Sequence, residues 1–510
     1  MIEYYNVVEC DVLVVGAGPT GLTLSAELAR RGIRHQLIER APEPQTGSRG
    51  KGLQPRSLEI LRDLGVVDEI LATGTVGMPL RLFRDHRQIA ELPTASGGPR
   101  PGVPYPDLVV LPQWRVERIL RDRLHTLGLD VRFGAELLAA EQDGTGVTAT
   151  VRQGQAEQVV RAGYLVGCDG GHSTVRKLLG ARLIGHTREQ SLYVGDVRIA
   201  GLPDDAAYTW FGRDGSYLAV APLPHSGGAW QLQATPEPGS PSVLPAPTLG
   251  TFQRLFAERS GRTGVRLSEA SWLSSFRFNT RMVDSYRHGR IFLAGDAAHV
   301  HTPAGAQGMN TGIQDAYNLG WKLAAALGGA SEALLDSYTA ERRPVAAKVL
   351  AGSTRGAEVL LGLHPFLRDH VVFPLLEQPA IMRRLLARTS ELDIAYPASP
   401  LTLRAEDRRR PRPGERAPDA YGPGGRLFDI MRGTHWTLLG FGARTTAALR
   451  AAEAAHPGVT SHVVTDHRHQ ARRLYHARPG TLVLIRPDGY IATRTLRPQT
   501  VMDHLSRLGV

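Results

Sequence analysis

The chain has 510 residues, of which 42% are hydrophobic and 21% are charged, a composition typical of a soluble globular protein with room for several domains. Its formal net charge is +11, but the basic residues are spread along the whole sequence, which argues against nucleic-acid binding. We expect a cytoplasmic protein without a disulfide scaffold or membrane span, because Cys10 and Cys168 are its only cysteines, the start shows no signal peptide, and no apolar run reaches about 18 residues.

The first predicted unit is a strand, a glycine turn, a helix and a second strand, in residues 11–40. The turn GAGPTG fits G-x-G-x-x-G, in which glycines permit a tight turn and close approach of a pyrophosphate at the helix N-terminus. Glu39, at the end of the second strand, is placed to accept hydrogen bonds from the adenosine ribose. A merely tight turn is the alternative. The predicted cofactor contacts are Gly16, Gly18, Pro19, Thr20, Gly21, Glu39 and Arg40.

Further along, a helix is predicted near residues 55–64 and strands at 129–166. Alternating patterns at 192–278 predict an antiparallel sheet inserted between two halves of the nucleotide-binding unit. A buried strand ends at Asp296, and a long helix begins near Met309. An Arg-, Pro- and Gly-rich linker then precedes a small α/β domain.

The stretch GDAAHVHTPAGAQGMN, residues 295–310, decides between NAD and FAD. A ribityl chain needs an anchor far from the pyrophosphate, and the Asp296 carboxylate can accept from its hydroxyls. The small residues that follow, and the free N–H groups of the next helix, suit a flavin ring that becomes anionic when reduced. A metal site at His299 and His301 is disfavoured, because no third ligand is near in sequence. The predicted flavin contacts are Asp296, Pro303, Gly305, Gly308, Met309 and Asn310.

GAGPTG, the DG of LVGCDGGHSTVRKLLG and the GDAAH stretch together resemble the three signatures of class A flavoprotein aromatic hydroxylases, the p-hydroxybenzoate hydroxylase-like group. The resemblance implies an α/β fold: a Rossmann-like FAD-binding domain, an inserted antiparallel substrate-binding sheet and a C-terminal thioredoxin-like domain, as in polyketide and phenol hydroxylases. It places Asp169, Gly170 and Arg176 near FAD and the visiting nicotinamide. The expected domain limits are 1–185 and 286–400 for FAD, 186–285 for substrate, 401–413 for a linker, and 414–510 for a third domain without cysteines.

By the same resemblance, Arg49 and Gln113 match positions that contact FAD. Catalytic residues stay unknown, with Arg49 and Pro303 as candidates near the flavin. The implied chemistry is reduction of FAD by NADPH or NADH, addition of O₂ at flavin C4a, and transfer of OH from the hydroperoxide to an aromatic ring. Only one full G-x-G-x-x-G is evident, so the nicotinamide is expected to visit without a Rossmann domain of its own.

The expected substrate is a bulky phenolic, a polycyclic polyketide intermediate of antibiotic biosynthesis. Its predicted pocket includes Trp210, Phe211, Tyr217 and Trp230, for which core packing is the alternative. Baeyer-Villiger oxidation, hydroxylation of a small phenol or phenylpropionate, and a non-catalytic carrier or chaperone remain open. The oligomeric state also stays open, a homodimer included.

Overall fold

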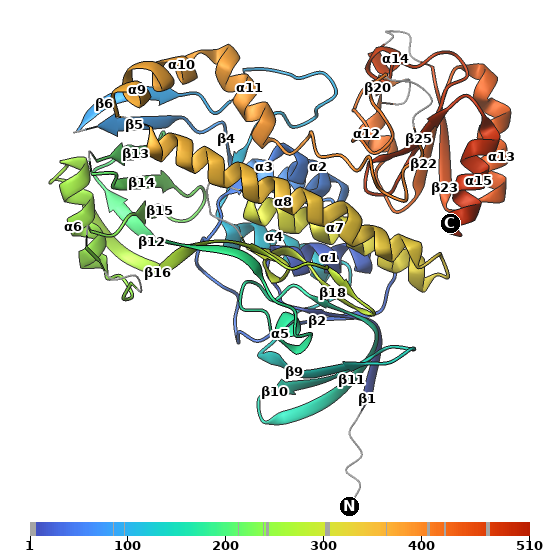
Figure 1. The fold of residues 1–510 in the computed structure, drawn as a ribbon, viewed down its shortest axis with the longest axis horizontal. Helices are drawn as coiled ribbons and strands as arrows, with labels where there is room; N and C mark the ends of the chain where they lie inside the picture. The colour runs from blue at the N-terminus through green and yellow to red at the C-terminus, as the bar shows by residue number, and fades with distance from the viewer. Residues whose placement is uncertain are drawn as a thin grey trace, which may run out of the picture.

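A computed structural model shows two large sheets with helices packed between and around them, and a C-terminal unit beside them (Figure 1). His301, Pro303 and Gly305 lie outside the described residues. None of the helices in the described ranges is both long and apolar enough to span a membrane. The structure describes residues 7–84, 86–95, 97–212, 214–237, 239–240, 244–300, 307–363, 365–404, 409–422, 425–465 and 470–510.

The first sheet has the strand order β17-β18-β11-β1-β2-β8, and β10 and β9 extend it from β11. The pairs of β1 with β2 and β11, and of β11 with β18, are parallel. The apolar run of β1 is buried, as expected for a strand covered on both faces. The strands are β1 (Val7–Val15), β2 (His35–Glu39), β8 (Arg132–Phe133), β9 (Ala135–Gln142), β10 (Val147–Gln153), β11 (Ala156–Gly167), β17 (Arg287–His288) and β18 (Ile291–Leu293).

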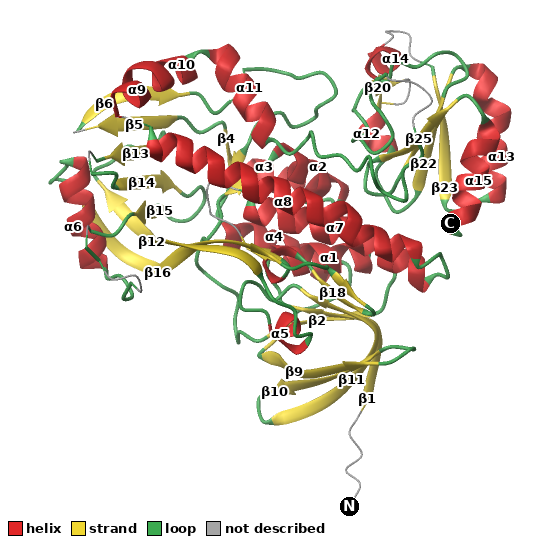
Figure 2. Cartoon of the chain, viewed as in Figure 1, coloured by secondary structure: helices red, strands yellow, loops and turns green. Residues whose placement is uncertain are grey.

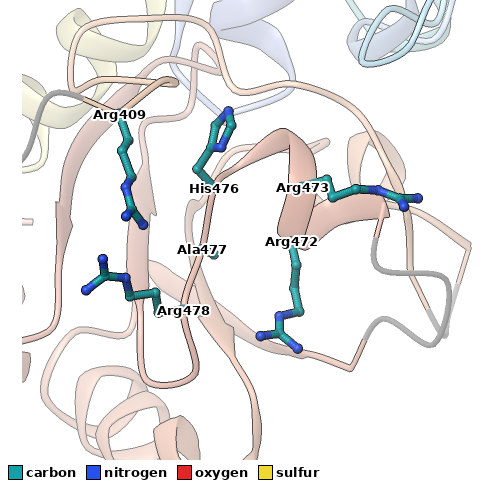
Figure 3. Close-up of a pocket in the computed structure, with 6 residues that line it drawn as sticks. All are labelled: Arg409, Arg472, Arg473, His476, Ala477 and Arg478. Atoms are coloured by element: carbon teal, nitrogen blue, oxygen red, sulfur yellow. The ribbon is translucent and has the colours of Figure 1, made fainter.

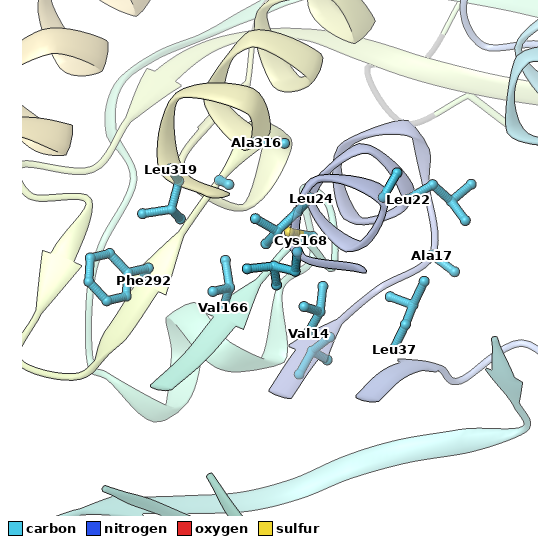
Figure 4. Packing of buried hydrophobic residues seen from close by; sticks show 14 of the residues in the cluster. Val14, Ala17, Leu22, Leu24, Leu37, Val166, Cys168, Phe292, Ala316 and Leu319 are labelled. Carbon is cyan, nitrogen blue, oxygen red and sulfur yellow. The ribbon is translucent and has the colours of Figure 1, made fainter. Parts of the chain in front are cut away.

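Helices α1 (Pro19–Ala29) and α7 (Gly308–Leu327) pack on each other and on this sheet (Figure 4). A Cβ added to Gly320 would lie 2.5 Å from Cγ of Glu27, so the small residues of the predicted α7 stripe permit the close approach. Leu24 and Ala316 belong to the buried core between them. This packing sets the start of α7 beside the start of α1.

The second sheet has the order β19-β16-β12-β15-β14-β13-β5-β6 (Figure 2). Residues 80–84 and 87–92, placed by the sequence in the FAD-binding range, form β5 and β6 of this sheet, and β5 pairs in parallel with β13. Helix α6 (Leu249–Ser260) covers one face; we call the opposite face the inner face. The strands are β5 (Leu80–Arg84), β6 (Arg87–Leu92), β12 (Ile184–Ala200), β13 (Ala207–Phe211), β14 (Tyr217–Pro222), β15 (Ala229–Ala234), β16 (Arg266–Met282) and β19 (His299–Val300).

The remaining elements before the C-terminal unit connect the two sheets. A small sheet has the order β3-β7-β4. The elements are β3 (Gly52–Leu53), β4 (Thr75–Val76), β7 (Val109–Val110), α2 (Pro55–Asp63), α3 (Val67–Thr73), α4 (Gln113–Thr126), α5 (Thr174–Leu178), α8 (Ala333–Gly362), α9 (Pro365–Leu367), α10 (Phe373–Glu377) and α11 (Pro379–Thr389).

The C-terminal unit is a mixed sheet, β23-β22-β24-β25, with α13 and α15 against one face and α12 and α14 against the other. The sequence predicts a linker at 401–413, and at its start Leu403 is joined to β25, because its N–H donates to Ala492 O at 3.0 Å. The elements are β20 (Tyr421–Gly422), β21 (Gly425–Arg426), β22 (Trp436–Phe441), β23 (Val459–Val464), β24 (Leu482–Ile485), β25 (Ile491–Thr495), α12 (Leu427–Ile430), α13 (Thr446–Ala455), α14 (Gln470–Leu474) and α15 (Pro498–Leu508).

Candidate functional site

The glycine loop between β1 and α1 is tightly packed at two glycines and open at the third. Gly16 has φ +102°, and an added Cβ would lie 2.5 Å from the carbonyl oxygen of Cys168. A Cβ on Gly21 would collide with the carbonyl oxygen of Gly16. A Cβ on Gly18 would meet none of the described atoms within 4 Å. The loop therefore leaves room for a ligand at Gly18.

Helix α1 begins at this open glycine. Gly18 is the N-cap, Pro19 stands in the first turn, and none of the described side chains caps the helix or places an acid in its first turn. The N–H groups of Thr20 and Gly21 have no intrahelical acceptor, and they lie at the positive end of the helix dipole. This arrangement suits a pyrophosphate.

Glu39 lies beside the same loop at the end of β2. Its carboxylate accepts hydrogen bonds from the N–H groups of Ala17 and Ala41, both at 2.9 Å. The residue is only partly buried, and Arg40 next to it is exposed. A carboxylate can accept about four hydrogen bonds, so Glu39 retains acceptor capacity for ribose hydroxyls.

The carboxylate of Asp169 is engaged within the protein. It accepts from the N–H of Thr174 at 2.6 Å and the hydroxyl of Ser173 at 2.5 Å, at the start of α5. The Asp169 backbone does reach the glycine loop, because a Cβ on Gly16 would lie 2.8 Å from its Cα. Gly170 borders open space. This motif therefore faces the cofactor region with its backbone, while its carboxylate holds α5.

Arg176 joins the second motif to the third. Its guanidinium donates to the carbonyl oxygen of Gly171 at 2.7 Å and to that of Ala297 at 3.0 Å. The residue is 7% exposed, so these hydrogen bonds compensate the burial of its charge. Arg176 and Ala297 lie 121 residues apart in sequence, and their hydrogen bond holds the two motifs together.

Gly295 and Asp296 form a turn beside the glycine loop. Gly295 has φ +60°, and an added Cβ would lie 2.5 Å from Oγ1 of Thr20. Asp296 is exposed, whereas Gly295 and Ala297 are buried. The turn therefore presents one carboxylate to solvent next to the proposed pyrophosphate position.

Asp315 of α7 supports this turn from within the core. Its Oδ2 accepts from Gly295 N–H at 3.1 Å and from His299 Nε2 at 2.6 Å, and its Oδ1 accepts from Arg342 Nε at 2.6 Å. All three side chains are fully buried. Burial alone would raise the pKa of Asp315, but the charges of Arg342 and His299 outweigh it, and the pKa is lowered. His299 is thus committed to this buried network, where it also stacks on Tyr286.

The start of α7 contacts the segment that follows Arg49. Asn310 Oδ1 accepts from Gln54 N–H at 2.8 Å, and its Nδ2 donates to Gly52 O at 2.9 Å. None of the described side chains caps α7, whose N-cap is Gln307. The backbone N–H groups at Gly308 and Met309 therefore have no intrahelical acceptor.

Gln113, at the start of α4, supports the Arg49 segment as well. Its Oε1 accepts from Gly50 N–H at 3.1 Å, and its Nε2 donates to Glu117 at 2.9 Å. Burial raises the pKa of Glu117 to about 7. Met309 lies close to Gly50, and Arg49 itself is exposed. The structure thus brings most of the predicted contacts around one open region.

Residues 9–353 match the family described as FAD binding domain, and residues 410–508 match the family described as aromatic-ring hydroxylase, C-terminal. The chain belongs to the class A flavoprotein aromatic hydroxylases. Accordingly, it is an FAD-dependent aromatic monooxygenase. The open Gly18, the uncapped α1, the partly buried Glu39 and the exposed Asp296 fit the pyrophosphate, ribose and ribityl groups of FAD.

Similar proteins in this hydroxylase family cover nearly the whole chain. A flavin-dependent monooxygenase of Mycobacteroides abscessus is 42% identical over 511 residues, covering 98% of this chain and 99% of that protein. The 6-methylpretetramide 4-monooxygenase of Streptomyces rimosus is 37% identical over 520 residues, covering 96% and 91%. A ternary complex of aklavinone-11 hydroxylase with FAD and aklavinone has a TM-score of 0.82, is 28% identical, and covers 98% of this chain and 99% of that chain.

The aromatic residues predicted to form the hydroxylase's substrate pocket divide between two faces of the second sheet. Trp210 and Trp230 are 2% and 3% exposed and pack in the core beneath α6, which corrects their assignment to the pocket. Phe211 and Tyr217 lie on the inner face, where Phe211 stacks on Phe373 with ring centroids 5.8 Å apart. Because neighbouring residues of a strand point to opposite faces, Trp210 and Phe211 cannot line one pocket.

Several residues of the hydroxylase site were missed by sequence reasoning. Asp315 was missed, because its partners Gly295, His299 and Arg342 lie 16 to 27 residues away in sequence. Asp196 was missed as well, because it accepts from the N–H of Ser48, 148 residues away. A carboxylate placed four or five residues before Ser173 and Thr174 can cap the start of a helix. This spacing could have indicated the role of Asp169.

A basic cavity of about 460 Å³ lies in the hydroxylase's C-terminal unit, away from these motifs (Figure 3). It is lined by Arg409, Arg472, Arg473, His476, Ala477 and Arg478. None of these residues belongs to the three motifs that surround Gly18. The cavity is therefore separate from the FAD site.

Proposed function

We propose that this hydroxylase uses NADPH or NADH and O₂ to hydroxylate a polycyclic phenolic substrate of the polyketide type. The observation that carries the flavin part is the convergence of the three motifs around the open space at Gly18. The polycyclic substrate is supported by relatives named for 6-methylpretetramide and for anhydrotetracycline, each matching over at least 96% of this chain.

When bound, FAD supplies transfer of electrons from the nicotinamide to O₂ and of one oxygen atom to the ring. In our proposal the chain's own residues bind and orient the reactants. Glu39 and the α1 N-terminus hold the adenosine and pyrophosphate groups, and Asp296 accepts from the ribityl hydroxyls. The N–H groups at the start of α7 stabilise negative charge on the flavin pyrimidine.

The inner face of the second sheet is the proposed substrate surface. Its partly buried residues include Tyr217 and Gln233, whereas Phe211 is covered by Phe373 and Gln231 by Ser48. Helix α6 covers the other face. Aromatic rings with a few uncharged polar groups suit a polycyclic phenol better than a small carboxylate, which would need a dedicated cation. Both hydroxylation and Baeyer-Villiger oxidation place one oxygen atom in the product, so the product's structure must distinguish them.

The test compares a tri- or tetracyclic phenol with phenol, p-hydroxybenzoate and hydroxyphenylpropionate, with NADPH and NADH separately. We expect NAD(P)H oxidation to match formation of a product one oxygen atom heavier from the polycycle, with its ring retained in the NMR spectrum. Turnover of a monocyclic acid but not the polycycle would contradict the substrate assignment, and a ring-expanded lactone would indicate Baeyer-Villiger chemistry. Bound FAD that NAD(P)H does not bleach would favour a non-catalytic carrier.

A further inference from the structure

Ser48 is attached to the second sheet through both of its backbone polar groups. Its N–H donates to Asp196 Oδ2 at 2.8 Å, and its carbonyl oxygen accepts from Gln231 Nε2. Asp196 and Gln231 are directly paired across β12 and β15. Ser48, Asp196 and Gln231 are 0%, 2% and 0% exposed. The contact is therefore a buried junction between one residue of the Arg49 segment and two neighbouring strands.

A third strand contributes to the same junction. Trp272 of β16 is the partner of Asp196 on its other side, so Gln231, Asp196 and Trp272 form one row across three strands. A Cβ added to Gly47 would lie 2.5 Å from the Trp272 ring, so the chain passes the ring in close contact. Gln231 Oε1 accepts from Gln233 Nε2 at 2.9 Å, which extends the polar row along the inner face.

The next residues are attached to the FAD-binding side instead. Gly50 N–H donates to Gln113, and Lys51 O accepts from Leu111 N–H at 2.8 Å. Arg49 is the residue between these attachments, and it is exposed. Its backbone is thus held by the second sheet on one side and by the FAD-binding side on the other.

A carboxylate at this buried position is costly. Asp196 Oδ1 has no hydrogen-bond partner among the described residues. Burial raises the pKa of Asp196 to about 6, although the hydrogen bond from the Ser48 N–H and the charge of Lys51 oppose the increase. An apolar residue would fill this space at a lower cost in folding free energy. The carboxylate is therefore better explained by a positioning role than by a contribution to stability.

We propose that Asp196, with Gln231, is a positioning residue that places Arg49 at the cofactor by holding Ser48 against the inner face of the substrate sheet. The expected kinetic effect rests on the proposed function, whereas the expected structural effect does not. Asp196 contacts neither the glycine loop nor Asp296 in the described interactions, so its effect on FAD affinity should be small.

The test compares Asp196→Ala, Asp196→Asn and Gln231→Ala holoproteins with wild type. Arg198→Ala is the matched control, because Arg198 lies on the same strand with its side chain 52% exposed and paired with Glu269. Hydrogen exchange at the Ser48 amide should become at least about tenfold faster in Asp196→Ala, with a smaller increase in Gln231→Ala. Asp196→Asn should restore most of the protection, because its amide oxygen can still accept from Ser48.

In the same variants, kcat should fall about tenfold for Asp196→Ala, with KM for the aromatic substrate and Kd for FAD within about threefold of wild type. The visible spectrum of bound FAD should also shift in Asp196→Ala. Arg198→Ala should resemble wild type in every measurement, and Asp196→Asn should resemble it in kcat and in the flavin spectrum.

Unchanged exchange at Ser48 in Asp196→Ala would overturn the proposal. So would faster exchange throughout the second sheet, which would indicate a merely structural role, or faster Ser48 exchange with unchanged kcat. A wild-type protein inactive with every substrate would contradict the proposed function. If no substrate is turned over, hydrogen exchange at Ser48 and the spectrum of bound FAD still test the positioning role. An unchanged flavin spectrum in Asp196→Ala would then overturn it.

Discussion

Two glycines of the same loop should respond differently to one added methyl group. The methyl group of Gly18→Ala would have no described atom within 4 Å, and the negative φ of Gly18, −73°, is open to alanine. The free energy of unfolding should therefore change by less than about 1 kcal/mol. FAD affinity should nevertheless fall at least about tenfold, because the methyl group enters the pyrophosphate space. Gly21→Ala should destabilise the apoprotein by about 1–3 kcal/mol through its clash with Gly16. Urea unfolding and FAD fluorescence titration check both, and equal effects would refute this reading of the loop.

Asp296 should contribute directly to FAD binding. Asp296→Ala removes the exposed carboxylate from a turn whose neighbours are buried, and should weaken FAD binding by about 10- to 100-fold, the value of a charged hydrogen bond. Glu39→Ala should weaken it at the ribose end. Asp204→Ala, at an exposed surface position, is the control. Full flavin occupancy in both Asp296→Ala and Glu39→Ala would contradict the placement of the cofactor.

Glu391 should make stability depend on pH. Burial raises its pKa from 4.5 to about 8, against the opposing charge of Arg342 and the hydrogen bond from Gln314. The folded state therefore retains a proton that the unfolded state releases, and stability is lost as pH rises from about 4.5 to about 8, by at most ~1.4 kcal/mol per pH unit. Glu391→Gln cannot titrate, so its advantage over wild type in urea unfolding should grow with pH. A constant difference between about pH 5 and about pH 8 would show that Glu391 is ionised in the folded protein.

At the scale of elements, α7 presents backbone donors at its start and a buried ion pair within its length. Asp315→Ala leaves Arg342 without its carboxylate partner and removes an acceptor from Gly295, so we expect a loss of about 3–5 kcal/mol in urea unfolding. Lys348 and Asp393 supply the control, because this pair at 3.0 Å has side chains 69% and 55% exposed. Asp393→Ala should cost less than about 1 kcal/mol, and a similar loss in both variants would contradict the special role of the buried pair.

At the scale of the whole molecule, buried charges join the C-terminal unit to α7 and α8. Arg486 donates to both oxygens of Glu341, at 2.6 and 2.9 Å, and Lys322 donates to Glu341 at 2.7 Å, with all three side chains fully buried. Truncation before residue 414 would remove Arg486 and expose the apolar surface around Trp321. We therefore expect insoluble or flavin-depleted protein, assayed by yield and flavin absorbance. A soluble, fully active truncated chain would disprove this coupling.

Arg486→Ala tests the same coupling without truncation. It leaves Glu341 and Lys322 buried but removes the bidentate partner, so it should destabilise the full chain by about 3–5 kcal/mol. Arg444→Ala, in the C-terminal unit but outside the junction, should be close to wild type. If thermal unfolding showed an equal loss of stability in Arg486→Ala and Arg444→Ala, the effect would not come from the junction.

Much of the cofactor site could be predicted because its motifs are local. Gly16 to Gly21 encode a turn and a helix start within a few residues, and Asp296 lies in the turn that follows a buried strand, so each function follows from neighbouring residues. The side-chain role of Gln113 could not be predicted so fully. Its partner Gly50 lies 63 residues away in sequence, and their contact depends on how α4 meets the loop.

The sequence by itself determined the strand and helix periodicity, the backbone freedom at Gly16, and the family of the chain, because all of these are written in contiguous residues. Only the tertiary structure decided that Trp210 faces α6, that residues 80–84 and 87–92 join the second sheet, and that Asp196 meets Ser48. Asp196 and Ser48 lie 148 residues apart, and their contact depends on the register of three strands. A shift of one residue in that register would turn the carboxylate to the opposite face, and nothing in the local sequence of either segment encodes the register of the other.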